Sequence, residues 1–230
     1  MLCGPTEELN GSKGAATKEF TSQPPESLPS GKNNLQTIVS CTVNAARLTD
    51  IVAPIAIAIG GTAIFFIVHP AQKYFFVPAM IVALCCYFRT SYRQMPKPHR
   101  VLPVYLIALA IQFLHFTEEY VYGFHYRVTE LMEGMPPFNA NMFVAFNMIA
   151  YCLFLLAGVG MYKGLKFPMI IVWFFTCAAT IGNGVLHPLL ALRVGGYFPG
   201  LFTSLAYLIV GPMLFLRLWE GSNPQTTERG

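Results

Sequence analysis

The chain has 230 residues, which is enough for a single domain. Hydrophobic residues make up 54% of it and charged residues 11%, well below the roughly 25% charged residues of soluble domains. This composition excludes an ordinary soluble fold. The net charge of +4 comes from basic residues spread over several loops, so we expect no nucleic-acid partner.

The first part of the chain is polar. Residues 1–34 are rich in Ser, Pro, Gly, Lys and Glu and contain no apolar run, which predicts a disordered tail and not a signal peptide. A helical membrane domain is predicted for residues 35–222. Within it, residues 35–48 are expected to form a short interfacial helix. A short polar tail is predicted for residues 223–230.

Apolar runs near the length needed to cross a bilayer follow one another along the membrane domain. They predict an all-α, polytopic membrane protein built as a bundle of about six transmembrane helices. The predicted spans are 51–69, 74–90, 101–122, 140–161, 167–190 and 198–218.

The basic residues predict how these spans are oriented. Twelve of the fifteen Lys and Arg residues lie in the first tail, the second and fourth loops and the C-terminal segment. Cytoplasmic loops carry an excess of Lys and Arg. Both termini are therefore predicted to be cytoplasmic. An endomembrane, such as the endoplasmic reticulum, or the plasma membrane is the expected location.

The third predicted span carries polar residues that are costly inside a membrane. Residues three and four apart share one face of a helix, so His115, Glu118, Glu119 and Tyr122 form a polar stripe together with Gln112. Each charge inside a bilayer costs roughly 2.5–3.5 kcal/mol on insertion scales. We therefore expect this stripe to face a polar partner or a ligand.

A second polar stripe lies on the fifth predicted span. At about 1.5 Å rise per residue, Asn183 and His187 reach nearly the same depth as His115 and the two carboxylates. Asn147 of the fourth span lies at a similar depth. Pro188 removes a backbone hydrogen bond, which predicts a bent and open turn at this point. A cavity in the outer half of the bilayer is the expected result.

Two motifs resemble a known family. His115-Phe116-Thr117-Glu118-Glu119 is similar to the His-x-x-Glu-Glu motif that names the HXXEE family of small membrane proteins. In that family an Asn-x-x-x-His motif and a Tyr-x-Pro-Gly turn follow, as Asn183 to His187 and Tyr197 to Gly200 do here. The resemblance covers about residues 101–215. It implies which residues matter, and it implies no reaction, because the family is biochemically uncharacterised.

One hypothesis is a metal site. Imidazole nitrogens and carboxylate oxygens are suited to zinc, iron or manganese. Glu118 and Glu119 point about 100° apart on a helix, so we expect only one of them to bind a metal together with His115. The predicted ligand set is His115, Glu118 and His187. The five His residues of the chain are too few for a membrane hydroxylase or desaturase, which needs about eight.

Metal-free acid–base catalysis is an equally supported hypothesis. Burial raises the pKa of a Glu side chain, which can then donate or accept a proton near neutral pH. Such a site would isomerise, cyclise or hydrolyse a lipid-like, isoprenoid or polyketide-like substrate. The predicted catalytic residues are His115, Glu118, Glu119 and His187, and the predicted substrate-binding or supporting residues are Asn183, Tyr122, Asn147 and Tyr197.

A third hypothesis involves no catalysis. Polar pairs between membrane helices contribute roughly 0.6–2 kcal/mol each and can serve packing alone. The chain would then be a lipid-binding, accessory or scaffold protein. The expected function remains that of an enzyme. Its expected partners are membrane lipid and an apolar small-molecule substrate.

Overall fold

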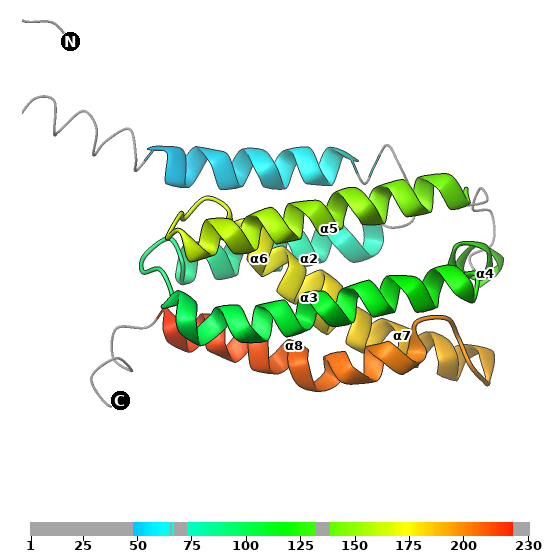
Figure 1. The fold of residues 1–230 in the computed structure, drawn as a ribbon. Helices are drawn as coiled ribbons and strands as arrows, with labels where there is room; N and C mark the ends of the chain where they lie inside the picture. The colour runs from blue at the N-terminus through cyan, green and yellow to red at the C-terminus, as the bar shows by residue number, and fades with distance from the viewer. Residues whose placement is uncertain (1–47, 65, 67–72, 132–138, 223–230) are drawn as a thin grey trace, which may run out of the picture. The chain divides into compact units, whose positions relative to one another are not determined.

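The computed structural model describes residues 48–64, 66, 73–131 and 139–222, and every regular element among them is a helix (Figure 1). The predicted polar tails and residues 35–47 of the predicted interfacial helix lie outside these residues. The elements are the helix Leu48–Ile64, α2 Lys73–Arg89, α3 Pro98–Val121, α4 Phe124–Leu131, α5 Ala140–Tyr162, α6 Met169–Phe174, the π-helix η1 Phe175–Gly182, α7 Asn183–Val194 and α8 Leu201–Gly221.

Four helices of the described part are long and apolar enough to cross a membrane: Pro98–Val121, Ala140–Tyr162, Met169–Val194 and Leu201–Gly221. The chain is therefore an all-helical integral membrane protein with several spans. The other two predicted spans correspond to shorter helices. Leu48–Ile64 is a shorter apolar helix, and α2 has 17 residues.

The structure differs from the sequence prediction in two elements. α4, a short helix of 8 residues, occupies part of the predicted loop after the third span. In the fifth span, eight residues form a π-helix between α6 and α7. The hydroxyls of Thr176 and Thr180 donate hydrogen bonds to the carbonyls of Val172 and Thr176, respectively, within the same span. π-Helical turns of this kind occur frequently at functional sites.

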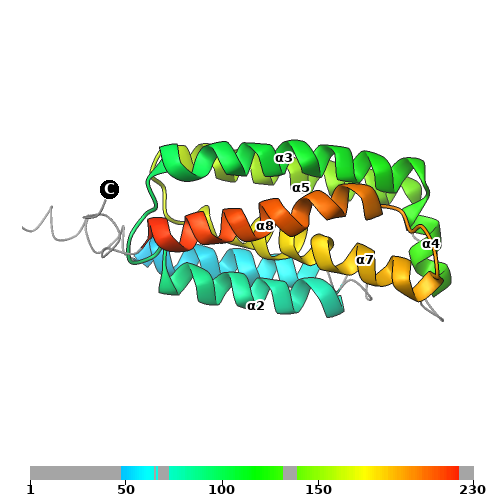
Figure 2. The same ribbon diagram turned by 90° about the horizontal axis from the view of Figure 1, so that it is seen from below.

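The long helices pack side by side, as the two ribbon views show together (Figures 1 and 2). α8 lies against α3, η1 and α7, α3 also packs on α5, and α2 covers α6 and η1. α3 thus lies between α5 and α8.

The backbones of α7 and α8 approach each other closely at Gly184. A Cβ atom at this position would lie 3.2–3.3 Å from Cβ and the backbone carbonyl carbon of Tyr207 and the backbone nitrogen of Leu208. Glycine therefore permits this contact, since a side chain would have to displace backbone atoms. The contact fixes α7 one turn before His187.

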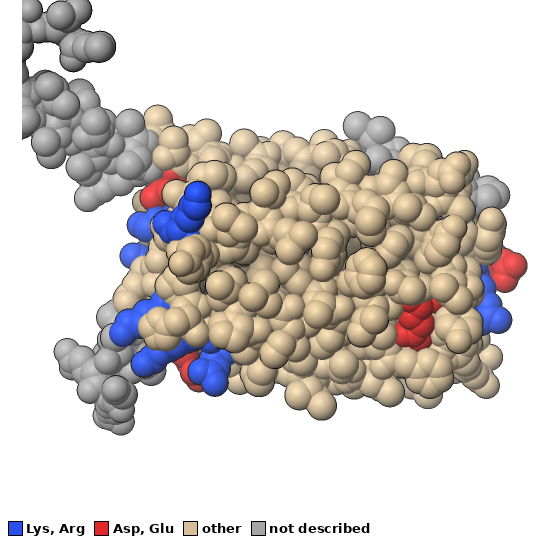
Figure 3. Space-filling model, viewed as in Figure 1, with Lys and Arg blue, Asp and Glu red and all other residues tan. Residues whose placement is uncertain are grey.

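Basic side chains gather at the end of this helical unit where α3 begins and α8 ends, at the left of Figure 3. An almost uncharged surface covers the middle of the helices in the same view. At the basic end, the Lys166 ammonium lies 3.8 Å from the Asp50 carboxylate. The Tyr87 hydroxyl donates a 2.7 Å hydrogen bond to the Asp50 carbonyl. These contacts join the helix Leu48–Ile64 to the rest of the bundle.

Candidate metal centre

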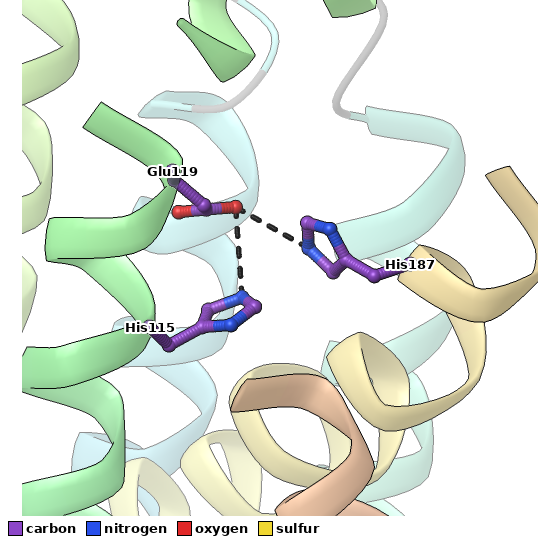
Figure 4. A group of neighbouring side chains, drawn as sticks. All are labelled: His115, Glu119 and His187. Carbon is purple, nitrogen blue, oxygen red and sulfur yellow. Dashed lines mark ion pairs between the residues drawn. The ribbon is translucent and has the colours of Figure 1, made fainter. Parts of the chain in front are cut away.

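Three buried side chains meet between α3 and α7 (Figure 4). His115 and Glu119 lie one turn apart on α3, and His187 reaches them from α7. Glu119 Oε1 lies 3.6 Å from His115 Nε2 and 3.3 Å from His187 Nε2. His115 is 0% exposed, His187 1% and Glu119 6%. The cluster is therefore shielded from the surroundings.

The proton of His187 is fixed by the loop before α8. His187 Nδ1 lies 2.6 Å from the carbonyl oxygen of Pro199. A carbonyl only accepts hydrogen bonds, so Nδ1 carries the proton and donates it. In the neutral ring, Nε2 is then an unprotonated nitrogen with its lone pair directed outward. It has no hydrogen-bond partner among the described residues.

The proton of His115 is fixed in the same manner through a hydroxyl. The Thr203 hydroxyl donates a 2.5 Å hydrogen bond to Glu118 Oε2. Its one proton is thus committed, and its oxygen accepts from His115 Nδ1 at 2.7 Å. His115 Nε2 is therefore also an unprotonated nitrogen in the neutral ring, and it too lacks a hydrogen-bond partner.

Two nitrogen lone pairs and a carboxylate thus face one another inside the protein. Three electron-rich groups repel each other unless a cation lies between them. The ligand atoms of His115, Glu119 and His187 all lie within 4.8 Å of one another. A tetrahedron with zinc–ligand bonds of about 2.0–2.1 Å has edges of about 3.3–3.4 Å, close to the two nitrogen–oxygen distances of the cluster. The three side chains are suited to hold a divalent cation.

Glu118 has a different place from the one predicted for it. Of the two adjacent carboxylates, the structure brings Glu119, not Glu118, beside the two imidazoles. Both Glu118 oxygens accept hydrogen bonds from the beginning of α8, from the backbone N–H groups of Phe202 and Thr203 at 3.0 and 2.9 Å. The expected ligand set of His115, Glu118 and His187 is corrected in this residue, because the Glu118 carboxylate is directed at Tyr197 and the beginning of α8.

Tyr197 and Tyr122, both predicted as supporting residues, lie around Glu118. The Tyr197 hydroxyl donates a 2.9 Å hydrogen bond to Glu118 Oε1. Burial, followed by the Glu118 carboxylate, raises the pKa of Tyr197 well above its usual value, so the phenol remains a donor at neutral pH. Tyr122 is 55% exposed, and its ring packs edge-on against Tyr197 at 5.3 Å. It does not take part in the cluster.

Gly200 allows the loop before α8 to pass directly over the two imidazoles. Its φ angle is +89°, in the left-handed region that favours glycine. A Cβ atom there would lie 2.5 Å from the ring of His187 and 2.9 Å from Cε1 of His115. The backbone can therefore hold both rings only if this residue has no side chain.

A cavity of about 740 Å³ adjoins the cluster. Glu119 and His187 line it, and so do the predicted supporting residues Asn183 and Asn147. His115 and Glu118 are not among its lining residues. The cavity extends along α5 between α2 and the helix Leu48–Ile64, and most of its lining side chains are apolar. A bound cation would thus be reached from the cavity on the side of Glu119 and His187.

Sequence reasoning missed three residues that complete the cluster: Pro199, Gly200 and Thr203. In the sequence, Pro199 and Gly200 stand out only as part of the Tyr-x-Pro-Gly turn from Tyr197 to Gly200. The signal for Thr203 was its position directly after that turn, at the start of a span. The Thr203 hydroxyl contacts His115 and Glu118 of α3. The sequence contains no pattern that reveals this contact between two helices.

Comparison with known proteins gives one match. The sequence model of a family described as "protein of unknown function with HXXEE motif" matches residues 106–215. No curated protein and no solved structure matches the chain. The matched region contains all three residues of the cluster, and also Glu118 and Thr203.

Proposed function

Since residues 106–215 belong to the HXXEE-motif family, whose function is unknown, we propose a function from the chemistry of the site. The chain is a membrane-embedded enzyme that uses a divalent cation held by His115, Glu119 and His187. Its substrate is a lipid-like molecule bound in the adjoining cavity. Two His and one Glu are the protein ligands of known catalytic zinc sites, which keep a further position open for water or substrate.

One observation carries this proposal: both Nε2 atoms are buried, have no hydrogen-bond partner among the described residues, and lie 3.6 and 3.3 Å from the same carboxylate oxygen. Each Nδ1 atom donates to an oxygen, as metal-binding His residues do with their second nitrogen. Metal-free acid–base catalysis explains the arrangement less well. A single proton on Glu119 could satisfy only one of the two nitrogens, whereas a metal ion satisfies all three groups.

Hydrolysis is the reaction that this site supports best among isomerisation, cyclisation and hydrolysis. A bound divalent cation lowers the pKa of a coordinated water to about 7 and polarises a carbonyl group. In ester hydrolysis, the water oxygen adds to the carbonyl carbon, the acyl–oxygen bond breaks, and a proton of the water passes to the leaving alcohol. Glu119 and His187 lie on the cavity side, where the carbonyl of a bound substrate would meet this water.

A packing role without catalysis accounts for Glu118 but not for the cluster. Glu118 joins α3 to α8 through hydrogen bonds, as the packing hypothesis expects. The two Nε2 atoms, in contrast, gain no such partner. The cluster therefore favours a ligand over simple helix packing.

We further propose six spans with both termini in the cytoplasm, in an endomembrane or the plasma membrane. The basic end of the helical unit supports this orientation, because it contains the second and fourth loops. The cluster would then lie in the outer half of the bilayer.

Metal analysis of the purified protein tests the proposal. The protein is purified with a tag that binds no metal, loaded with zinc, iron or manganese, and measured by mass spectrometry of the bound elements. We expect about one metal ion per chain, and its loss in Glu119→Gln and His187→Ala. His125→Ala is the matched control, since His125 is equally buried but lies outside the cluster. Equal metal content in wild type and Glu119→Gln would overturn the proposal.

A further inference from the structure

The cavity beside the cluster has one polar end and one apolar end. Glu119, His187 and Asn183 line the end near α4 and α7. Phe154, Ile170 and other apolar side chains of α5, α6 and α2 line the opposite end. A ligand that matches this distribution has a polar head and an apolar tail.

Two side-chain amides along the cavity wall offer hydrogen-bond donors. The Asn183 side chain, one turn before His187, makes no hydrogen bond to any described residue. Gln112 also lines the cavity, and its Oε1 accepts a 2.8 Å hydrogen bond from the Tyr207 hydroxyl. The Asn183 amide, at the polar end of the cavity, is suited to donate a hydrogen bond to an acceptor oxygen of a ligand.

The length of the cavity limits the tail. Its lining residues on α5 extend from Met142 to Phe154, which corresponds to about 18 Å at about 1.5 Å per residue. With bonds of about 1.5 Å and tetrahedral angles, an extended alkyl chain advances about 1.25 Å per carbon. About 14 carbons therefore span the cavity.

We infer that the cavity binds one unbranched acyl chain of about 14 carbons, with its carbonyl group between Asn183 and the cluster. The inference rests on the proposed function only for the position of the head group. The volume of about 740 Å³ lies within the roughly 300–1,000 Å³ of pockets that enclose one small molecule. The chain enters from the bilayer, since most of the side chains that line the cavity are apolar.

Photo-cross-linking with a fatty acid methyl ester tests the inference. The probe is methyl tetradecanoate with a diazirine at the last carbon, added to the protein in lipid nanodiscs, and labelled peptides are mapped by mass spectrometry. We expect labels on the peptides that contain Phe154 and Ile170. A probe with the diazirine beside the carbonyl is expected to label Met142 and Phe143 instead. The opposite pattern, or no difference between the probes, would overturn the inference.

Competition by unlabelled methyl esters of 8 to 22 carbons tests the length. Lipid tails are as apolar as the cavity, so burial alone gives little selectivity for chain length. The affinity for each ester is therefore expected to depend on how well its chain fits the cavity. We expect the strongest competition near 14 carbons and about tenfold weaker competition at 20 carbons, as overpacking a filled site implies. Competition that is independent of length, or equal competition by a two-chain phospholipid, would contradict the single-chain site.

Two further variants separate this inference from the proposed function. Ala150→Trp fills the cavity and is expected to abolish labelling, whereas the control Leu156→Trp, on the same helix but outside the cavity lining, should keep it. Glu119→Gln should lose the metal and keep the label at Phe154. Metal binding without labelling in wild type would refute the acyl-chain site alone, and labelling without metal binding would refute the metal centre alone.

Discussion

Thr203→Val is the sharpest test of how the cluster is held. The substitution keeps the branched shape of the side chain and removes only the hydroxyl that lies between His115 Nδ1 and Glu118 Oε2. Glu118 retains its hydrogen bonds to Tyr197 and to the backbone of α8. The effect on His115 can therefore be observed with the beginning of α8 still held.

The magnitude follows from the two roles of the hydroxyl. Loss of a partner that orients a metal-binding His typically lowers metal affinity 10–100-fold, or about 1.4–2.8 kcal/mol. His115 is completely buried, so its Nδ1–H group also loses the one acceptor that it has among the described residues. An unsatisfied buried donor costs about 1–3 kcal/mol of folding stability. Both losses are expected in the same variant.

Zinc affinity is measured by competition with a chromogenic chelator, and stability by thermal unfolding in detergent. Thr203→Ser restores a hydroxyl and should recover most of the affinity. Thr117→Val is the matched control, because the Thr117 hydroxyl only donates to the carbonyl of Phe113 on the exposed side of α3. Wild-type zinc affinity in Thr203→Val would refute the role assigned to this hydroxyl, whatever its effect on stability.

Three further substitutions test separate parts of the structure. Gly200→Ala should displace both imidazoles and abolish metal binding. Gly196→Ala is the control and should leave metal binding intact, because nothing lies within 4 Å of its new Cβ atom. Equal metal binding by both variants would contradict the close approach of Gly200 to the two imidazoles. Tyr105→Phe removes a buried 2.8 Å hydrogen bond to the Phe154 carbonyl and should lower the unfolding free energy by about 1–2 kcal/mol. Burial lowers the pKa of His125 in the folded protein. Below about pH 6.5, His125 therefore binds a proton more readily in the unfolded chain than in the folded protein. The temperature midpoint of unfolding should consequently fall more steeply in wild type than in His125→Phe as the pH is lowered.

The sequence could predict the helical membrane architecture because hydrophobic runs of span length are local features. It also singled out His115, Glu119 and His187, since polar residues inside apolar spans stand out from their neighbours. The boundaries were less accurate around α4 and η1. α4 is short and has no long apolar run, and a π-helix leaves no mark in hydropathy.

By itself, the sequence determined that His115, Glu119 and His187 lie in spans at similar depth, because residue count fixes the rise along a helix. Only the tertiary structure decided which carboxylate meets the two imidazoles. Glu118 and Glu119 are identical in chemistry and adjacent in sequence, and the packing of α8 against α3 and of α7 against α8 gives each a different partner. The proton positions of both His residues were also decided there, since Pro199 and Thr203 reach them across helices, at contacts that no local pattern encodes.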